Sequence, residues 1–137
     1  MTKIRIFLAD DHPAMLEKVA DLLEGTYEVV GTASDGQAAL NEVIRQCPDV
    51  LLIDISMPVM NGIDAAGNLM RKHVPTKIIF LTVHDDLDFV KAALATGAAG
   101  YVIKSHMATD LIPAIREALA DHRFISPCIH AQDSRVQ

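Results

Sequence analysis

The sequence has few aromatic residues and little cysteine. It contains no tryptophan, two tyrosines and four phenylalanines, whereas half of its residues are hydrophobic. Aliphatic side chains must therefore do most of the packing, as in buried parallel strands that are covered by helices. The two cysteines, Cys47 and Cys128, lack the spacing of a metal site, so we expect both to be free thiols in a reducing compartment.

Long hydrophobic runs and basic clusters are also missing. No apolar stretch approaches the length of a membrane span, and the first residues lead into a strand pattern rather than a signal peptide. The 12 basic residues are outnumbered by 18 acidic ones, and the net charge of −6 argues against this chain gripping a nucleic acid by itself. We therefore expect a soluble cytoplasmic domain that makes no membrane contact.

Strand and helix patterns alternate five times over the 137 residues, a length that fits one domain. The strand patterns cover residues 4–9, 28–33, 50–54, 77–82 and 100–104, and the helix patterns cover residues 13–24, 35–46, 63–73, 85–96 and 108–121. No linker or low-complexity segment interrupts them. This alternation predicts an α/β fold with a doubly wound, five-stranded parallel sheet.

Local signals set some of the expected helix boundaries. Ser34 with Gln37 three residues later matches a capping box at the start of a helix. Gly25 fits the left-handed residue that closes the preceding helix. Pro113 must lie in the first turn or so of the last helix, where backbone donors have no intrahelical partner anyway.

One carboxylate follows an apolar run that starts at Val50. The run is bounded by turn signals and is typical of a strand buried on both faces, so Asp54 lies where this strand ends. A charge at such a position is costly unless it is solvated, paired or bound to a metal. In parallel sheets, ligands bind at the carboxyl ends of the strands. The alternative is that Asp54 only caps the loop that follows.

Polar side chains stand at the carboxyl ends of four of the predicted strands. They are Asp10, Asp11, Asp54, Thr82 and Lys104. The carboxyl ends of parallel strands lie along one edge of a sheet, so we expect these side chains to converge on one crevice. Three carboxylates that lie so close repel one another, and a hard divalent cation such as Mg²⁺ relieves the repulsion. A lysine and a hydroxyl that face the same cation suit an incoming phosphoryl group.

Each of these residues also has a purely structural interpretation. The acidic pair Asp10 and Asp11 could start the first helix, where carboxylates suit the helix dipole. Thr82 could be an ordinary residue at the end of a strand, and Lys104 could be a solvated surface lysine. Chance placement of one such residue is common, whereas placement of all five at the right strand ends is not.

With these residues considered together, the sequence resembles the receiver domain of bacterial two-component response regulators. The resemblance covers Lys3 to Ala120. It is carried by the acidic pair, the loop Asp54–Pro58 with Gly62, Thr82, and the strand Tyr101–Lys104. It implies a flavodoxin-like (βα)5 fold with the strand order 2-1-3-4-5.

The resemblance also implies a role for most of the crevice. Asp54 would accept a phosphoryl group from the phosphohistidine of a sensor histidine kinase and become an acyl phosphate. Asp11 and Asp54 would hold Mg²⁺ directly, together with the backbone carbonyl of Ser56, whereas Asp10 would hold it through water. Ser56 and His84, each two residues beyond a key position, are expected to affect how water reaches the acyl phosphate.

After phosphorylation, the resemblance implies a switch. The Thr82 hydroxyl and the Lys104 ammonium would contact the new oxygens, and Tyr101 would rotate into the space left by the loop after the fourth strand. The face of the fourth helix, fifth strand and fifth helix would change shape, and we expect a phosphorylation-dependent homodimer. Tyr101 could instead serve only in packing. His12 and His84 flank the crevice without metal-ligand spacing and are expected to be exposed polar residues.

The chain departs from the family pattern at two positions. Ser105 follows Lys104 where many receivers have proline, so the peptide bond that places Lys104 is open between cis and trans; a cis bond without proline costs about 3 kcal/mol. Val83 is bulkier than the small residue that usually follows the threonine, and we expect it to narrow the entrance to the crevice.

Three other functions compete with a phosphorylated receiver. A nucleotide binder needs small residues and backbone donors after the first strand, whereas Asp10–Pro13 is acidic and Pro13 has no donor. An aspartyl-phosphate phosphatase carries a second aspartate two residues after the nucleophile, where this chain has Ser56, so we expect slow turnover and no dedicated enzyme. A receiver that acts only as a docking module is disfavoured by the intact set of polar residues.

The residues after the last predicted helix indicate an output. Phe124–Pro127 resembles the junction in regulators with a C-terminal helix-turn-helix, the NarL/FixJ/LuxR-type subfamily. We therefore predict a receiver over residues 1–122 and a linker and frayed tail over residues 123–137, leading to a DNA-binding output domain absent from this chain and so to a role in transcription. The alternative is a stand-alone regulator that acts by protein–protein docking.

Overall fold

A computed structural model of the chain describes residues 3–132. Its strands are β1 (Arg5–Ala9), β2 (Glu28–Ala33), β3 (Val50–Ile53), β4 (Lys77–Thr82), β5 (Gly100–Ile103) and β6 (Phe124–Ile125). Its helices are α1 (Pro13–Leu23), α2 (Gly36–Gln46), α3 (Gly62–Arg71), α4 (Leu87–Leu94), α5 (Met107–Leu119) and α6 (Pro127–Gln132), and the 3₁₀ turn η1 (Lys104–His106) precedes α5. The predicted alternation of strand and helix is confirmed, and β6 and α6 extend it.

The strands form one parallel sheet in the order β2-β1-β3-β4-β5-β6. The order predicted for the first five strands is therefore confirmed. The prediction missed β6 because a strand of two residues is too short to show an alternating pattern. In the register of the sheet, Ala9 pairs with Ile53 and Thr82 pairs with Ile103. The residues that follow these pairs therefore share one edge of the sheet.

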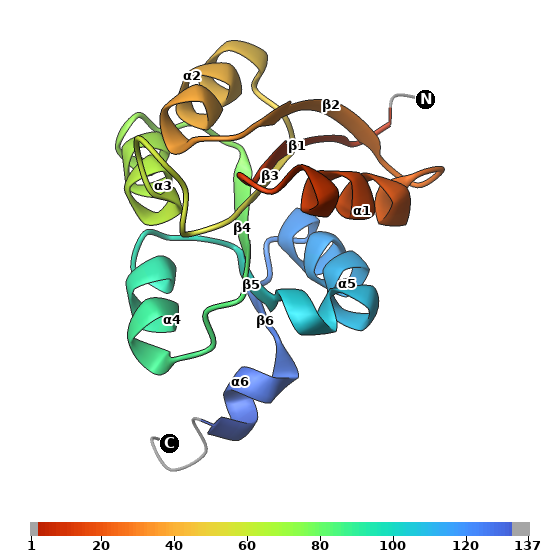
Figure 1. Ribbon diagram of the computed structural model, residues 1–137, viewed down its shortest axis with the longest axis vertical. Coiled ribbons are helices and arrows are strands. Elements are labelled where there is room, and N and C mark those ends of the chain that lie inside the picture. The colour runs from red at the N-terminus through yellow and green to blue at the C-terminus, as the bar shows by residue number, and fades with distance from the viewer. Residues whose placement is uncertain (1–2, 133–137) are drawn as a thin grey trace.

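Helices cover both faces of the sheet, with α1 and α5 on one side and α2, α3 and α4 on the other (Figure 1). Successive side chains of β1 point to opposite faces, so Phe7 packs with the α2–α4 layer and Leu8 packs with the α1–α5 layer. All four residues of β3 are buried, which explains their uninterrupted apolar sequence. Polar side chains of the central strands are therefore confined to the strand ends.

Two of the predicted helix boundaries are wrong. Asp35, not Ser34, caps α2, because its carboxylate accepts a hydrogen bond of 2.7 Å from the backbone N–H of Ala38. Aspartate is as good a capping residue as serine, and it stands one position later. Helix α5 already begins at Met107, so Pro113 lies in its second turn, where it removes one intrahelical hydrogen bond.

Other local expectations are confirmed. Gly25 has a φ of +85° just after α1, in the left-handed region. The bond between Lys104 and Ser105 is trans, as are the other peptide bonds of the described residues. Cys47 and Cys128 are both free thiols. Within residues 3–132, no helix combines the length and the hydropathy needed to cross a bilayer.

Candidate functional site

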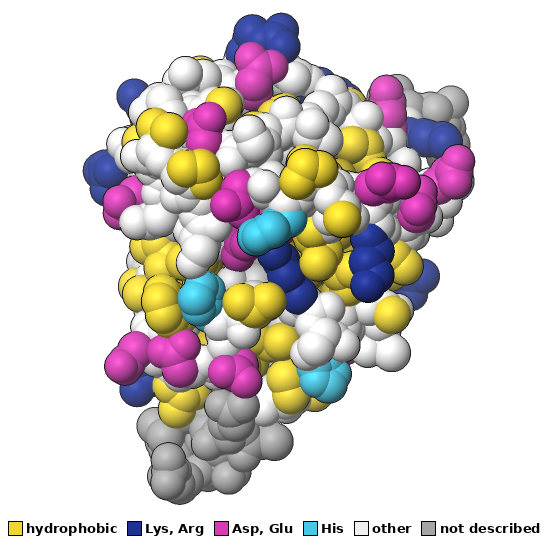
Figure 2. Space-filling view, in the orientation of Figure 1, with side chains coloured by type: hydrophobic (Ala, Val, Ile, Leu, Met, Phe, Trp, Pro, Cys, Tyr) yellow, Lys and Arg dark blue, Asp and Glu magenta, His cyan; other side chains and the backbone are white. Residues whose placement is uncertain are grey.

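The carboxyl edge of the sheet carries buried acidic side chains. Asp10 and Asp54 directly follow β1 and β3, and their backbone N–H groups continue the ladders by donating to the carbonyls of Ala33 and Ala9 at 3.0 Å each. Both aspartates are only 4% exposed. Figure 2 shows acidic and histidine side chains beside a basic one near the middle of the visible face. The structure therefore brings Asp10 and Asp54 to one edge of the sheet, and both carboxylates are largely removed from water.

Lys104 lies between these two carboxylates. Its Nζ is 2.7 Å from Asp10 Oδ2 and 2.9 Å from Asp54 Oδ2, and its side chain is 8% exposed. Burial alone would lower the pKa of Lys104, but the hydrogen bonds to Asp10 and Asp54 outweigh it, so the pKa lies above its usual value. Lys104 is therefore a buried ammonium and not the solvated surface lysine that the sequence left open.

Asp11 contributes a third carboxylate whose inner oxygen has no hydrogen-bond partner. Asp11 Oδ1 is buried, and although His12 Nδ1 lies 3.0 Å from it, the pair does not meet hydrogen-bond geometry. His12 Nδ1 is also 3.1 Å from Asp10 Oδ1, which accepts the His12 backbone N–H at 2.9 Å. The imidazole is 69% exposed, as expected, yet its inner nitrogen faces the carboxylates.

The donor set fits a divalent cation. Asp10, Asp11, His12 and Asp54 each offer one ligand atom, and these atoms lie within 4.8 Å of one another. Lys104 offers one positive charge against three carboxylates, and Asp11 Oδ1 has no partner in the described residues. An oxygen-rich site with excess negative charge suits Mg²⁺. Asp11 and Ser56 both line a groove of about 650 Å³.

The ends of β4 and β5 bring Thr82, His84 and Tyr101 to the same edge. Thr82 is fully buried, and its hydroxyl lies 3.4 Å from the backbone nitrogen of His84. His84 Nε2 lies 2.7 Å from Ser56 Oγ, and its ring stacks on Phe89 with centroids 4.2 Å apart. The expectation that His84 is an exposed polar residue is therefore wrong: it is partly buried and joins the loops after β3 and β4.

Tyr101 is held inside the domain. Its ring is fully buried, and its hydroxyl donates a hydrogen bond of 2.6 Å to the carbonyl of His84. Burial raises the pKa of Tyr101 far above its usual value, with Asp86, Asp54 and Asp85 adding to the effect. The hydroxyl therefore stays protonated and keeps donating to the loop after β4. Val83, in that loop, is 65% exposed.

A glycine lets the chain after Asp54 fold back on itself. The N–H of Gly62, the first residue of α3, donates to the carbonyl of Ile55 at 2.8 Å. A Cβ added at Gly62 would lie 2.0 Å from the carbonyl oxygen of Asp54. No real side chain tolerates that distance to backbone, so any residue larger than glycine would displace the loop that carries Asp54.

We expect Gly62→Ala to damage the site and the fold together. The overlap with the Asp54 carbonyl should lower the free energy of unfolding by about 1–3 kcal/mol or more. Gly67→Ala is the matched control, because its added Cβ would meet only the tip of Arg71 at 3.4 Å and a glycine inside a helix is unfavourable. Urea denaturation of both variants checks this, and equal stabilities would contradict the close approach at Gly62.

Sequence reasoning missed the side-chain contacts that join separate loops. The pair Ser56 and His84 spans 28 positions, and no local pattern indicates which way a loop side chain turns. The available signal was their equal offset, each two residues beyond the last polar residue of its strand. That offset predicted a shared influence on the crevice but not a direct contact.

Comparisons with known proteins agree on a family. Residues 6–116 match the response regulator receiver domain. The transcriptional regulatory protein DegU of Brevibacillus brevis is 38% identical over 127 residues, which cover 91% of this chain and 54% of DegU. The probable transcriptional regulatory protein NarL of Mycobacterium tuberculosis is 35% identical over 129 residues, which cover 93% of this chain and 60% of NarL.

Solved structures give the same result. A two-component response regulator of the LuxR family from Aurantimonas sp. SI85-9A1 has a TM-score of 0.91 at 33% identity, covering 99% of this chain and 100% of that one. The signal receiver domain of the putative response regulator NarL from Mycobacterium tuberculosis has a TM-score of 0.83 at 35% identity, covering 88% of this chain and 98% of that one. The chain spans 54–60% of the length of the two curated relatives described above. It therefore belongs to the response regulator receiver domain family, and the relatives named above are transcriptional regulatory proteins and LuxR-family or NarL response regulators.

Proposed function

We propose that this domain is phosphorylated on Asp54 by a sensor histidine kinase, the class of partner with which receiver domains work. The observation that carries the proposal is the buried Asp54 carboxylate, which lies against Lys104 and next to two further carboxylates. In the transfer, an Asp54 oxygen attacks phosphorus while the phosphorus–nitrogen bond to the kinase histidine breaks. The leaving imidazole nitrogen takes a proton from solvent, and the product is an acyl phosphate.

The chain's own groups prepare the charge that this transfer needs. Asp11, Asp54 and the backbone carbonyl of Ser56 would hold Mg²⁺ directly, and Asp10 would hold it through water. Bound Mg²⁺ would supply positive charge to the oxygens of the transferring group. Lys104 is already charged and lies 2.9 Å from Asp54 Oδ2, so its ammonium needs little movement to meet an incoming phosphoryl group.

We propose Thr82 and Tyr101 as the switch residues. A phosphoryl group on Asp54 brings new oxygens that can accept a hydrogen bond from the Thr82 hydroxyl. A movement of Thr82 toward them carries His84, whose carbonyl holds the Tyr101 hydroxyl. Contacts that form only after modification thus favour a second packing of the α4–β5–α5 face. We propose that this face then forms a homodimer.

The proposed output is transcription. Residues 1–122 would form the receiver, and residues 123–137 would lead to a DNA-binding domain outside this chain. Two observations support this: the curated relatives are transcriptional regulators, and the chain spans 54–60% of their length. The expected frayed end, residues 133–137, lies outside the described residues. A stand-alone regulator that acts by docking would be phosphorylated on Asp54 in the same way.

Acetyl phosphate with Mg²⁺ tests the proposed function without a kinase. We expect intact-mass spectrometry to detect one added phosphoryl group that is lost slowly. Rapid release of free phosphate without an adduct would indicate a phosphatase-like enzyme instead. If the mass did not change and no phosphate were released, a docking module without phosphorylation would be the better description.

A further inference from the structure

A buried group of polar side chains joins β6 to the end of β5. Ser126 follows β6 and is fully buried. Its hydroxyl donates to Asp110 Oδ2 at 2.8 Å and accepts the backbone N–H of Ile103 at 3.0 Å. Its own N–H donates to the carbonyl of Tyr101 at 2.9 Å. Ser126 therefore continues the β5–β6 ladder with its side chain, while its carbonyl accepts the N–H of Ile129 at 2.9 Å.

Asp110 is a buried carboxylate with a specific structural task. It lies in the first turn of α5, is 8% exposed, and accepts a second hydrogen bond from the hydroxyl of Thr109. Burying a carboxylate is costly unless its oxygens are hydrogen-bonded, and here two hydroxyls and the helix dipole serve that purpose. The arrangement fixes which way the Ser126 hydroxyl points, because Asp110 can only accept. The Ser126 oxygen is thereby left to accept the N–H of Ile103.

The hydrogen bond between the Ile103 N–H and the Ser126 hydroxyl lies one residue before Lys104 of the phosphoacceptor site. Ile103 is the last residue of β5, and the next residue, Lys104, leaves the strand at η1 while its Nζ lies between Asp10 and Asp54. The Ile103 N–H is thus the last hydrogen bond that positions the backbone before Lys104. A displacement of about 1 Å in a group that contacts a reacting centre is enough to matter for phosphoryl transfer.

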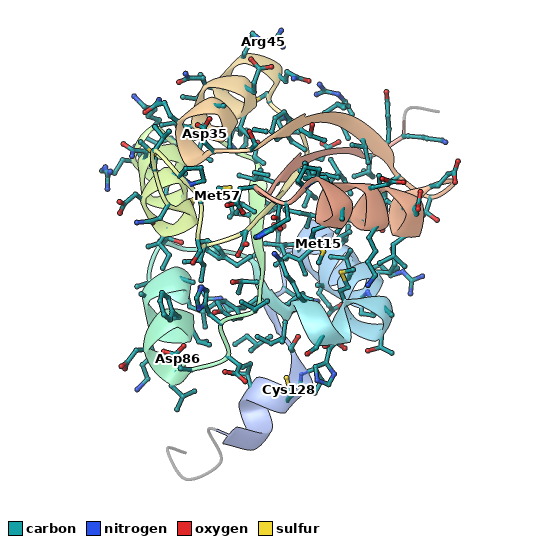
Figure 3. All side chains as sticks on the ribbon, viewed as in Figure 1. Met15, Asp35, Arg45, Met57, Asp86 and Cys128 are labelled. Atoms are coloured by element: carbon teal, nitrogen blue, oxygen red, sulfur yellow. The ribbon has the colours of Figure 1, made fainter. Side chains whose placement is uncertain are left out.

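The same serine also meets the proposed switch residue. The carbonyl of Tyr101 accepts the Ser126 N–H, while the Tyr101 hydroxyl donates to His84 on the loop after β4. Beyond Ser126, Ile129 of α6 is 3% exposed and packs in the same core cluster as Tyr101. Figure 3 shows Cys128 of α6 directed toward the body of the domain. The segment from β6 to α6 is therefore attached to β5 at Tyr101, the proposed switch residue, and at Ile103, the residue before Lys104.

We propose that Ser126 and Asp110 are positioning residues for Lys104, and that attachment of β6 and occupancy of Asp54 are coupled. The inference rests on the proposed function and extends it to the segment that was expected to be only a linker. The coupling is reciprocal. If the hydrogen bonds of Ser126 strengthen the binding of a phosphoryl group at Asp54 by placing Lys104, then a bound phosphoryl group must stabilise those hydrogen bonds by the same factor.

The test compares two buried hydroxyls at opposite ends of the sheet. Thr76 is 5% exposed, and its hydroxyl donates to the carbonyl of Pro48 at 2.7 Å, far from the carboxyl edge. Ser126→Ala and Thr76→Ala should both lower the melting temperature, because each leaves a buried polar group without its partner. Beryllofluoride with Mg²⁺ serves as the phosphoryl probe. We expect only Ser126→Ala to weaken its binding, by about tenfold.

Two further measurements separate positioning from general stability. Ser126→Thr keeps the hydroxyl and should restore binding of the probe. In the wild-type protein, beryllofluoride with Mg²⁺ should slow hydrogen exchange at the amides of Ile103 and Ser126 more than at the amide of Lys77, which lies in the same sheet beside Thr76. The exchange experiment needs no variant, so it tests the coupling between β6 and Asp54 even if Ser126→Ala fails to fold.

The outcomes are distinguishable. Equal probe binding by Ser126→Ala and Thr76→Ala, or unchanged exchange at Ile103 and Ser126 in the saturated wild type, would overturn the coupling and leave the proposed function intact. Failure of the wild-type domain itself to bind beryllofluoride and to accept phosphate would instead overturn the proposed function, and the inference with it.

Discussion

Asp54→Asn is expected to abolish phosphorylation by acetyl phosphate or a cognate kinase. An amide is a poor nucleophile, and we expect the rate of labelling to fall more than about 10³-fold, as when an enzyme loses its nucleophile. Intact-mass spectrometry over a time course measures the loss.

The same variant should not lose stability. Asparagine keeps the shape of the side chain and removes one of three carboxylates that repel one another. We therefore expect a Mg²⁺-free melting temperature equal to or above that of the parent. Asp88→Asn, at an exposed position of α4, is the control for charge removal and should be labelled normally. Labelling of Asp54→Asn at the parent's rate would mean that another residue accepts the phosphoryl group.

Lys104→Met should have the largest effect on stability. It removes the ammonium that lies between two buried carboxylates, and breaking a buried ion pair costs about 3–5 kcal/mol. We expect a loss near the lower end of that range without a divalent ion, because the crevice is open to solvent on the side of Asp11. Adding Mg²⁺ should recover part of the loss, since a cation can replace the missing positive charge.

Urea denaturation with and without Mg²⁺ checks this effect. Lys91→Met, which removes an exposed lysine from α4, is the matched control and should change the free energy of unfolding by less than about 0.5 kcal/mol. A Lys104→Met variant as stable as this control in the absence of Mg²⁺ would contradict the arrangement of Lys104 between Asp10 and Asp54.

The contribution of Lys104 should also depend on pH in a defined direction. The pKa of Lys104 in the folded protein lies above its usual value, because its hydrogen bonds to Asp10 and Asp54 overcome the effect of burial. The stabilisation is therefore fully present below the unfolded pKa of about 10.4 and is lost as pH rises through the higher folded pKa. The difference in the free energy of unfolding between the parent and Lys104→Met should be constant near neutral pH. It should shrink only when the pH rises above the unfolded pKa of about 10.4.

The sequence was sufficient to place most of the candidate site. Asp10, Asp54, Thr82 and Lys104 could be grouped because each stands at the carboxyl end of an apolar strand, and parallel strands must present their carboxyl ends at one edge. That argument depends only on the order of elements and not on side-chain conformations. The order of elements also predicts the parallel sheet, because five alternations of strand and helix allow few other arrangements.

What the sequence could not give depends on contacts between distant segments. Ser126 and Asp110 are 16 positions apart, and a serine before a proline is also common in ordinary linkers. The pairing of Ser56 with His84 required the two loops to be placed first. At α2, Ser34 and Asp35 are equally good capping residues, and the structure uses Asp35.

The most direct test of the central claim is to locate the phosphoryl group chemically. Borohydride reduces an aspartyl acyl phosphate to homoserine, and peptide mass spectrometry then identifies the modified position. After treatment with acetyl phosphate and Mg²⁺, we predict homoserine at position 54 and at no other aspartate, and none when Mg²⁺ is replaced by a chelator. Homoserine at position 10 or 11, or equal modification without the ion, would contradict the account.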